Sequence, residues 1–426
     1  MRKRPTLLAR AAALVTTVGV ALAGALVFTA APAQAKLTQT NFGFQATAYG
    51  TRVVGGDLPA TSGRTAFSFI SCTRLAGRHA SNNIAEADLG GAVHVGAVTS
   101  SNHTWRGRLG SVHVRSTNAI ASVTLKQPDG PGVKIKSLKT YAHSWHGRTG
   151  YHTSTRTSGV IVLPLPSGDV QEVPLPGEGE TLKIPGLATI TGGWKHERTG
   201  KHYAHSSVNA LRIRLVASNS LVIVGRAWAR VNGGLPAGVM DGEAYGSKLT
   251  LLGGVVTSGK TAVKPLPCRG TRGVWRHTST IDVKIPPVSP QIQVTATRSS
   301  VYGIQYANGA AKARVRTDIA KVSLGGGQVV IKGIHAQARV NKYRGGSYTK
   351  DARGTTPSSI TFNGETHSLP SKGSYDLGAL GRIETGKRSK GRYGIRVTAV
   401  KITLFNGTQA DTVLYLGNAR ARIKPY

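Results

Sequence analysis

Acidic residues are scarce in this chain of 426 residues. It contains 18 Asp and Glu against 55 Lys and Arg, which gives a formal charge of +37 at neutral pH. Four of the basic residues and none of the acidic ones lie in the first 35 positions, so the rest of the chain carries +33. The excess is spread over both halves. Such a protein repels cations and attracts polyanions in a manner that depends on the salt concentration.

Aromatic residues and cysteine are also scarce. Phe, Trp and Tyr make up 6% of the chain and there are two cysteines, whereas 54 residues are glycine. This composition excludes a core built on aromatic rings and a dense disulfide framework. The Val, Thr, Ser and Gly between the turns favour short β-branched strands joined by tight turns.

Long apolar runs are missing beyond residue 31. The run Ala11–Ala31 follows a basic head and precedes Ala33-Gln34-Ala35, a pattern typical of a secretory signal peptide with cleavage near Lys36. The alternative is an uncleaved membrane anchor, because the run is long enough to span a bilayer. The small residues directly after the run favour cleavage. We therefore expect a secreted, extracellular protein with no transmembrane segment in the mature chain, and association with the cell wall is a further expectation.

The sequence contains a repeat of nearly 200 residues. Ala48-Tyr49-Gly50 recurs as Ala244-Tyr245-Gly246, and Cys72 recurs as Cys268 at the same offset. Further matches follow in the same order: 135–138 with 331–334, 210–215 with 399–404, and 224–230 with 416–422. The repeat predicts a signal peptide (1–35), a first copy of one domain (36–235) and a second copy (236–426). The Gly- and Pro-rich stretch 231–238 is the expected joint.

Helical periodicity is absent, and the local patterns are those of β-strands. Ile360–Leu369 contains an Asn-Gly turn between two short strands, the pattern of a β-hairpin. Leu211, Ile213 and Leu215 alternate with Arg212 and Arg214, which predicts one core face and one cationic face. A second hairpin is expected to turn at Asn406-Gly407. We therefore predict an all-β fold of two tandem homologous antiparallel domains, each a β-sandwich or open barrel.

These elements resemble a known family. The features are the opening Ala-Tyr-Gly strand, one cysteine before a loop, the late Asn-Gly hairpin, and the closing strands Val208–Leu211 and Val224–Ala227. Together they resemble the actinobacterial secreted proteins called choice-of-anchor P, once per copy and over almost all of the mature chain. The resemblance implies attachment to the cell surface and carries no established activity or catalytic residues. We recognise no C-terminal anchor like that of the anchored members, so we expect retention at the wall to depend on charge or on partners.

The cysteines Cys72 and Cys268 occupy equivalent positions in the two copies. In an oxidising compartment a bridge between them is a candidate, and it would bring their Cα atoms within roughly 7 Å around a pseudo-twofold axis. The alternative is two separate thiols inherited by duplication. The sequence leaves both possibilities open.

Signatures of catalysis and of metal binding are missing. The chain contains no G-x-S-x-G, no H-E-x-x-H and no phosphate-binding glycine loop. Pairs such as His143 and His146 have a spacing that places the two rings on opposite faces of a strand. The acidic pairs Glu86/Asp88, Glu178/Glu180 and Asp241/Glu243 have no obvious equivalents in the other copy. We predict no enzyme, no cofactor and no metal site.

Two equivalent basic segments with aromatic residues are the strongest candidate for binding. They are expected to be loops, at 193–203 and 381–393, in which Lys and Arg contact anionic groups while the aromatic rings stack. The candidate binding residues are Trp194, Lys195, Arg198, Lys201, Tyr203, Arg382, Lys387, Arg388, Lys390, Arg392 and Tyr393. Trp105, Trp145 and Trp275 are likewise followed by basic residues. The competing interpretation is a turn motif in which the aromatic residue covers the edge of the core.

These observations predict a non-catalytic secreted or cell-surface-associated protein. Its expected partner is an anionic polymer, such as a teichoic-type polymer of the cell wall or another polyanion, without specific recognition of nucleic acid. One alternative is a carbohydrate-active hydrolase on a β-scaffold, which would require a catalytic carboxylate such as Glu86. The other is a purely structural protein of a surface layer or coat.

Overall fold

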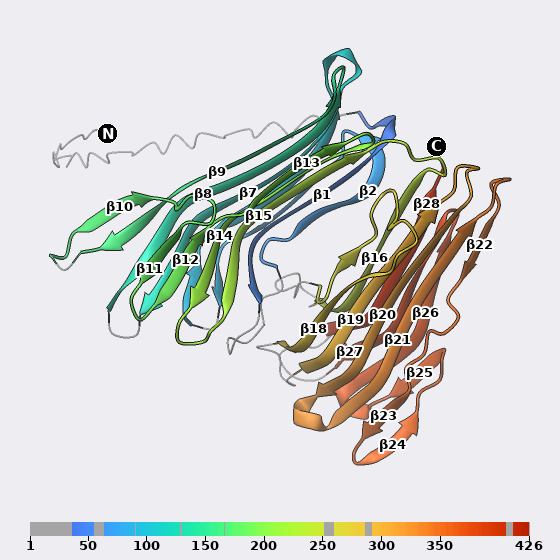
Figure 1. The fold of residues 1–426 in the computed structure, drawn as a ribbon. Coiled ribbons are helices and arrows are strands. Elements are labelled where there is room, and N and C mark those ends of the chain that lie inside the picture. Colours follow the sequence, from blue (N-terminus) through green and yellow to red (C-terminus); the bar gives the residue numbers. More distant parts are fainter. Residues whose placement is uncertain are drawn as a thin grey trace, which may run out of the picture. The chain divides into compact units, whose positions relative to one another are not determined.

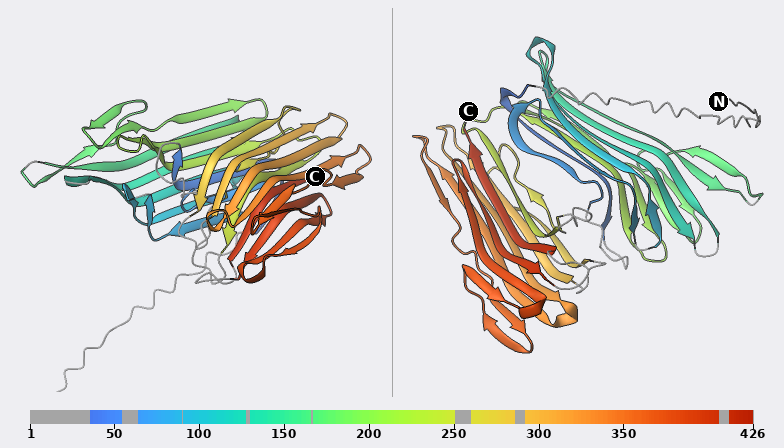
Figure 2. Two further views of the ribbon diagram at one scale, coloured as in Figure 1. Left: turned by 90° about the horizontal axis from the view of Figure 1, so that it is seen from below. Right: turned by 180° about the vertical axis from the view of Figure 1, so that it is seen from behind.

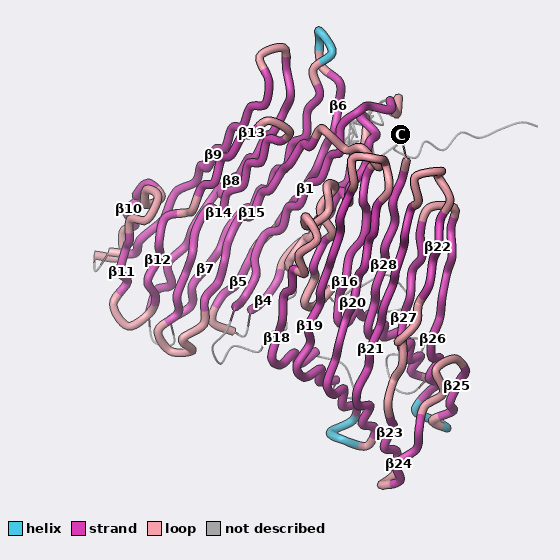
Figure 3. The backbone as a smooth tube through the Cα atoms, turned by 45° about the vertical axis from the view of Figure 1, so that its right-hand side comes forward, coloured by secondary structure: helices cyan, strands magenta, loops and turns pink. Residues whose placement is uncertain are grey.

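A computed structural model describes residues 36–54, 64–89, 91–127, 130–165, 167–250, 260–285, 292–405 and 412–425 (Figure 1). The predicted signal peptide and the Asn406-Gly407 turn lie outside these ranges. The described residues form β-strands and three short 3₁₀ turns, η1 (Arg108–Gly110), η2 (Gly325–Gly327) and η3 (Gly378–Leu380). Figure 3 shows these turns at the ends of the strands. No helix in the described ranges is long and apolar enough to cross a membrane.

The first copy consists of two antiparallel sheets, which we call sheet A and sheet B. Sheet A has the order β11 (Thr181–Ile184), β12 (Ala188–Gly192), β14 (Tyr203–Leu215), β15 (Leu221–Asn232), β1 (Thr38–Val54) and β2 (Ser68–Ala76), and β13 (Lys195–Gly200) also pairs with β14. Sheet B has the order β10 (Val170–Pro174), β9 (Gly150–Pro164), β8 (Gly130–Gly147), β7 (Val112–Gln127), β5 (Val93–Val95) and β4 (Ala87–Leu89). In addition β6 (Val98–Arg106) pairs with β7, and β3 (His79–Ile84) pairs with β6.

The second copy also consists of two antiparallel sheets, sheet C and sheet D. Sheet C has the order β17 (Lys264–Pro265), β16 (Val239–Thr250), β28 (Thr412–Lys424), β27 (Gly394–Leu404), β26 (Gly381–Gly391) and β25 (Gly373–Asp376). Sheet D has the order β18 (Arg276–Ile285), β19 (Ile292–Gln305), β20 (Ala311–Leu324), β21 (Val329–Lys342), β23 (Ser359–Phe362) and β24 (Glu365–Ser368), and β22 (Tyr348–Asp351) pairs with β21. In Figure 2 the strands of the second copy are coloured from yellow to red.

The order of the strands is the same in both copies. In sheet A the central neighbours are β14, β15, β1 and β2, and in sheet C the corresponding neighbours are β27, β28, β16 and β17. Sheets B and D correspond in the same way, from β8, β7, β6 and β3 to β21, β20, β19 and β18. The fold is therefore all-β and antiparallel, with two sheets in each copy, as the sequence predicts. The boundary between the copies at residue 235 stays a prediction, although residues 233–238 do join β15 to β16.

Each copy buries its own aliphatic core between its sheets. One large cluster of the first copy includes Val98, Ile135 and Leu211, and the cluster of the second includes Val294, Ile331 and Ile402. Leu211, Ile213 and Leu215 are buried, and Arg212 and Arg214 are exposed, so the predicted alternation is confirmed. The hairpin predicted around Asn363-Gly364 is also confirmed, because β23 pairs with β24. Alternating strands that bury one face and expose the other are the expected building block of a β-sandwich.

A glycine in the same place of each copy allows an irregularity in the last strand. Gly225 in β15 and Gly417 in β28 have φ values of +65° and +60°, a conformation that favours glycine. A Cβ atom on Gly225 would lie 2.9 Å from the Cβ atom of Ala210, so the site also lacks space for a side chain. The repeated glycine thus has a physical reason in the shape of the strand.

Cys72 and Cys268 are joined by a disulfide with a Cα–Cα distance of 5.4 Å. Both cysteines are buried in a small cluster with Leu235 and Val239. Of the two possibilities that the sequence leaves open, the structure has the bridge. It connects equivalent positions that are 196 residues apart.

Candidate functional site

The basic segment predicted as a loop at 193–203 is a β-hairpin, so that structural expectation was wrong. β13 pairs with β14 along its whole length, and the chain turns after Gly200. The rings of Trp194 and His196 stack with their centroids 5.2 Å apart, whereas Glu197 accepts hydrogen bonds from Thr153 and Thr155 of sheet B. Because strand side chains alternate, Arg198 shares the face of His196, and Lys195 shares the face of Glu197.

The equivalent segment at 381–393 is also a hairpin, formed by β26 and β27. Arg388 and Lys390 lie opposite the buried residues Val397 and Ile395, whereas Lys387 lies opposite Thr398. The cations of this hairpin therefore project to two faces. The exposed residues are Arg382, Lys387, Arg388, Lys390 and Arg392, and Tyr393 is half-buried against the ring of Tyr348. In neither copy does the structure gather the predicted residues into one pocket.

Both basic hairpins contain an edge strand. β25 pairs with β26 only from residues 382 to 385, so residues 386–391 form the edge of sheet C among the described strands. Charged side chains, especially lysine, on an edge strand prevent it from pairing with another chain. Protection of the edge is thus a structural role for these cations beside the predicted role in binding.

A larger aromatic feature lies on the outer face of sheet B. We call it the ring ladder, and its members are His79, His103, Trp105, His113, His143, Trp145 and His152. Four of the rings, one from each of β6, β7, β8 and β9, lie directly opposite one another across the sheet. They are Trp105, His113, Trp145 and His152. The other three come from β3, β6 and β8 and form the neighbouring row.

The ring ladder follows from strand alternation and register. On β7 and β8 the residues next to the rings, such as Val114 and Ala142, are buried in the core, so the rings project outward. The aromatic residues recur at every second position, as in His103-x-Trp105 and His143-x-Trp145. The predicted separation of His143 and His146 is seen here, because the His146 ring contacts Phe42 and Tyr151 instead.

The rings are close enough to form a continuous stack. The centroids of Trp105 and His113 are 4.8 Å apart with an interplanar angle of 7°, and those of His143 and Trp145 are 4.6 Å apart with an angle of 21°. The Nδ1 atom of His113 is 3.1 Å from the Nε2 atom of His143, so one ring donates a hydrogen bond to the other. Offset stacking at these separations stabilises aromatic pairs and holds the rings nearly parallel.

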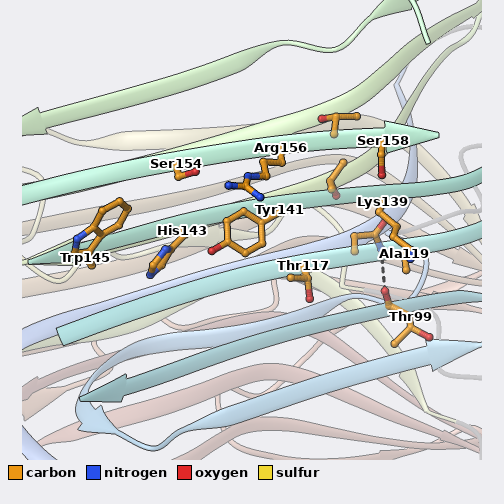
Figure 4. A pocket seen from close by; sticks show the side chains of 13 residues that line it. Thr99, Thr117, Ala119, Lys139, Tyr141, His143, Trp145, Ser154, Arg156 and Ser158 are labelled. Carbon is orange, nitrogen blue, oxygen red and sulfur yellow. Dashed lines mark hydrogen bonds between the residues drawn. The ribbon is translucent and has the colours of Figure 1, made fainter. Parts of the chain in front are cut away.

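A hollow adjoins the ring ladder on the same face. It has a volume of about 720 Å³, and its outward-facing lining runs from Trp145 and His143 to Tyr141 and Lys139 along β8 (Figure 4). The next strand contributes hydroxyl groups and a cation, and β6 and β7 contribute the remaining side. The side chains of those strands are Ser154, Arg156, Ser158, Thr99, Thr117 and Ala119. From Trp145 to Lys139, over four outward positions of β8, the exposed side chains of this face therefore change from aromatic rings to hydroxyl groups and cations.

The electrostatics of the ring ladder keep its central histidines neutral at pH 7. Burial lowers the pKa of His103 and of His113 below its ordinary value. Burial, with smaller effects from His113 and Arg115, lowers the pKa of His143 to about 4. The permanent charge on this face comes instead from cations such as Arg115, whose guanidinium group lies 5.4 Å from the centroid of the Trp105 ring.

The acidic pairs that the sequence offered for catalysis have local partners. Glu178 accepts a hydrogen bond from the backbone N–H of Lys195, and Glu180 accepts one from that of Gly177. Glu86 lies 3.9 Å from His94, and Asp88 lies 3.8 Å from Lys126. Within the described part of the chain, no three His, Cys, Asp or Glu side chains come together as possible metal ligands.

The second copy has a different surface at the corresponding place on sheet D. There Lys312, Arg339 and Asn341 stand at the positions equivalent to His113, His143 and Trp145. Arg339 lies 4.0 Å from Asp351 of the neighbouring strand, so an ion pair replaces a ring contact. An aromatic contact remains between Trp275 and Tyr302, with centroids 5.5 Å apart. The ring ladder is therefore a feature of the first copy.

Comparison with known proteins identifies no relative of this chain. No family model, no curated protein and no solved structure matches it.

Proposed function

We propose that this protein is a non-catalytic, secreted or surface-associated protein that binds anionic polymers, and that the outer face of sheet B is its main binding face. The observation that supports this proposal is the ring ladder beside a hollow bordered by cations. The basic hairpins would add electrostatic attraction around it. The resemblance to choice-of-anchor P proteins agrees with a place at the cell surface and stays a prediction.

The ring ladder has the properties of an aromatic binding platform. The outward edges of the stacked rings form an apolar surface that sugars or bases can contact, and nearby Lys and Arg attract the charged groups of the same polymer. Only 6% of the residues are aromatic, yet two of the five tryptophans lie in this one ladder. A ladder of partly exposed rings contributes less to the core than buried rings would, so binding is the better explanation of their position.

The size of the face favours a polymer over a small ligand. The rings come from five neighbouring strands, β3, β6, β7, β8 and β9. Neighbouring strands are about 4.8 Å apart, so the ladder extends over roughly 20 Å. This length accommodates several units of a polymer.

The proposal is tested by binding of polymers to the mature protein at several salt concentrations. We expect a teichoic-type polymer or heparin to quench the tryptophan fluorescence, with an affinity that falls steeply between about 50 and 200 mM salt. Replacement Trp145→Ala should weaken binding by about tenfold, since loss of one stacking ring typically costs 1–3 kcal/mol. The matched control is Trp275→Ala, because Trp275 lies in the second copy and is 43% exposed.

Three outcomes would contradict the proposal. Equal losses of polymer affinity in the two tryptophan variants would show that the ring ladder is not part of the binding face. Turnover of a wall glycan that is abolished by Glu86→Gln would favour the hydrolase. Absence of both binding and turnover would favour a purely structural surface or coat protein.

A further inference from the structure

The duplication provides an internal comparison on the outer faces of sheets A and C. In both copies the first strand pairs with the last strand in the same register. Gln45, Thr47 and Tyr49 lie opposite Arg230, Trp228 and Arg226 in the first copy. The corresponding residues Asp241, Glu243 and Tyr245 lie opposite Arg422, Arg420 and Asn418 in the second copy.

In the second copy this face carries both signs of charge. Glu243 pairs with Lys260 at 2.7 Å, and Asp241 pairs with Arg420 at 3.2 Å and with Lys424 at 3.1 Å. Asp241 is 1% exposed. Its burial acts to raise its pKa, but Arg420, Lys424 and Arg422 outweigh this effect and hold the pKa below its ordinary value. The two carboxylates are thus neutralised by cations of the protein itself.

In the first copy both carboxylates are replaced by neutral side chains, and the set of cations changes. Trp228 stands where the second copy has Arg420, whereas Arg230 stands where it has Arg422. Arg226 is an additional cation, at the position of Asn418.

Arg64 corresponds to Lys260, and its guanidinium carbon lies 5.2 Å from the centroid of the Tyr49 ring. Arg226 lies directly opposite Tyr49 on the neighbouring strand and donates a hydrogen bond to the Oδ1 atom of Asn209 at 3.0 Å. Neither arginine forms an ion pair with any carboxylate of the described residues.

These guanidinium groups are withdrawn from water. Burial is the main cause that lowers the pKa of Arg64 to about 10 and that lowers the pKa of Arg226, and each arginine also lies near Arg52. Both groups therefore keep their charge at neutral pH without a described counter-ion. A partly buried charge without an opposite charge nearby is costly unless an ion from solution compensates it.

A second observation comes from two rows further along the same face, where Arg230 lies opposite Gln45 and His205. The Nε atom of Arg230 and the Nε2 atom of His205 are buried and have no hydrogen-bond partner among the described residues. Polar groups buried in this way normally find a partner in the protein or in bound solvent species. The rings of His205 and Trp228 have their centroids 5.3 Å apart, and the guanidinium carbon of Arg226 lies 5.9 Å from the centroid of the Trp194 ring.

We propose that Arg64 and Arg226, held around Tyr49, form a binding site in the first copy for a tetrahedral oxyanion of the phosphate or sulfate type. Planar guanidinium groups bind such oxyanions through paired hydrogen bonds. The bound anion takes the electrostatic place that Glu243 occupies in the second copy. The site lies on sheet A and is therefore separate from the ring ladder on sheet B.

The experiment measures thermal unfolding of the whole mature protein with inorganic phosphate or sulfate, against chloride at the same ionic strength. A ligand that binds only the folded state raises the melting temperature with concentration, which yields an apparent affinity. We expect saturable stabilisation of the wild type by phosphate, by sulfate or by both. Comparison of the two anions identifies which one the site prefers.

Two variants and two controls locate the effect. Arg226→Gln removes a cation, and Thr47→Glu introduces the carboxylate that the second copy has. Each should weaken the apparent anion affinity by about tenfold, which corresponds to the loss of one charge-assisted contact. Arg214→Gln removes an exposed cation elsewhere on sheet A and should leave the affinity within about twofold. Circular dichroism checks that each variant is folded.

The proposal is overturned if phosphate and sulfate stabilise the wild type no more than chloride does. It is also overturned if the Arg226→Gln and Thr47→Glu variants bind the anions as tightly as the wild type. The same conclusion follows if the control Arg214→Gln loses as much anion affinity as those two variants. The ring-ladder variant Trp145→Ala should keep the wild-type anion affinity. The two sites can therefore succeed or fail independently.

Discussion

The central histidine of the ring ladder, His143, is held neutral by its surroundings. Trp105, Trp145 and Tyr141 contact its ring, and His113 and Arg115 repel a positive charge on it. Because the folded pKa of about 4 is below the ordinary value of 6.5, the unfolded chain takes up a proton more readily than the folded chain. Stability should therefore fall as the pH is lowered from 6.5 towards 4, and this contribution should be constant outside that window.

We predict that His143→Gln reduces this pH dependence. The free energy of unfolding of the wild type should decline between pH 6.5 and 4. In the variant this decline should be less steep, by at most about 1.4 kcal/mol per pH unit, which is the value for one proton. Urea unfolding followed by circular dichroism at several pH values measures the slope. His79→Gln, at the exposed end of the ladder, is the control. Identical slopes for the wild type and His143→Gln would show that this imidazole does not titrate as inferred.

At the scale of the strand, the sequence predicts which face of a strand is buried, but it does not predict which residues of two paired strands lie side by side. The alternation of Leu211, Ile213 and Leu215 with arginines predicted the buried and exposed faces of β14 correctly. The ring ladder was missed, although His103-x-Trp105 and His143-x-Trp145 have the spacing of residues on one face of a strand. Which rings meet depends on the register between successive strands, and periodicity within one strand does not specify that register.

The basic hairpins show the opposite error. Gly, Lys and Ser at 386–391 have low strand propensity and favour a loop, yet pairing with β27 places them in β26. Tertiary pairing overrides local propensity in such edge strands. The same dependence on neighbours explains why the anion site could not be predicted, because Arg64 and Arg226 are 162 positions apart and meet only through β1.

The cations of the β26–β27 hairpin lead to a prediction at this scale. We expect simultaneous replacement of Lys387, Arg388, Lys390 and Arg392 by Ser to weaken polymer binding more than a matched loss of four charges elsewhere, because these cations lie within six residues on one exposed hairpin. Fluorescence titration at about 50 mM salt measures the affinity. The matched set comprises exposed cations of the same copy, namely Lys321, Lys332, Arg344 and Arg353.

Self-association distinguishes the two roles of this hairpin. If its cations mainly protect an edge strand, both sets will weaken binding equally, and only the hairpin variant will self-associate in sedimentation velocity experiments. That result would contradict the predicted binding role of the hairpin. It would leave the ring ladder as the main binding face.

For the whole molecule, the two copies share a topology and differ in surface chemistry. The first copy carries the stacked rings and arginines that lack described carboxylate partners, whereas the second copy has ion pairs at the corresponding places. A duplicated scaffold keeps its core because the aliphatic alternation of each strand must be retained. Its outer faces are free to change, and in this chain the faces of the first copy have the features of binding surfaces.

The disulfide leads to the last prediction, because it connects the two copies. It closes a loop between residues 196 positions apart, and the chain-entropy model assigns a loop of this length a stabilisation of roughly 5 kcal/mol. The double replacement Cys72→Ala and Cys268→Ala should therefore lower the free energy of unfolding markedly, with some additional loss from the buried cluster around Leu235 and Val239. Each single replacement should cost about as much as the double one, because either one removes the bridge. Urea unfolding of the three variants measures these differences, with the free thiol of each single variant blocked by alkylation.

Thiol titration of the denatured wild type without reductant should find no reactive cysteine. Two reactive thiols per chain, or additive losses in the single variants, would show that the cysteines act as separate buried side chains.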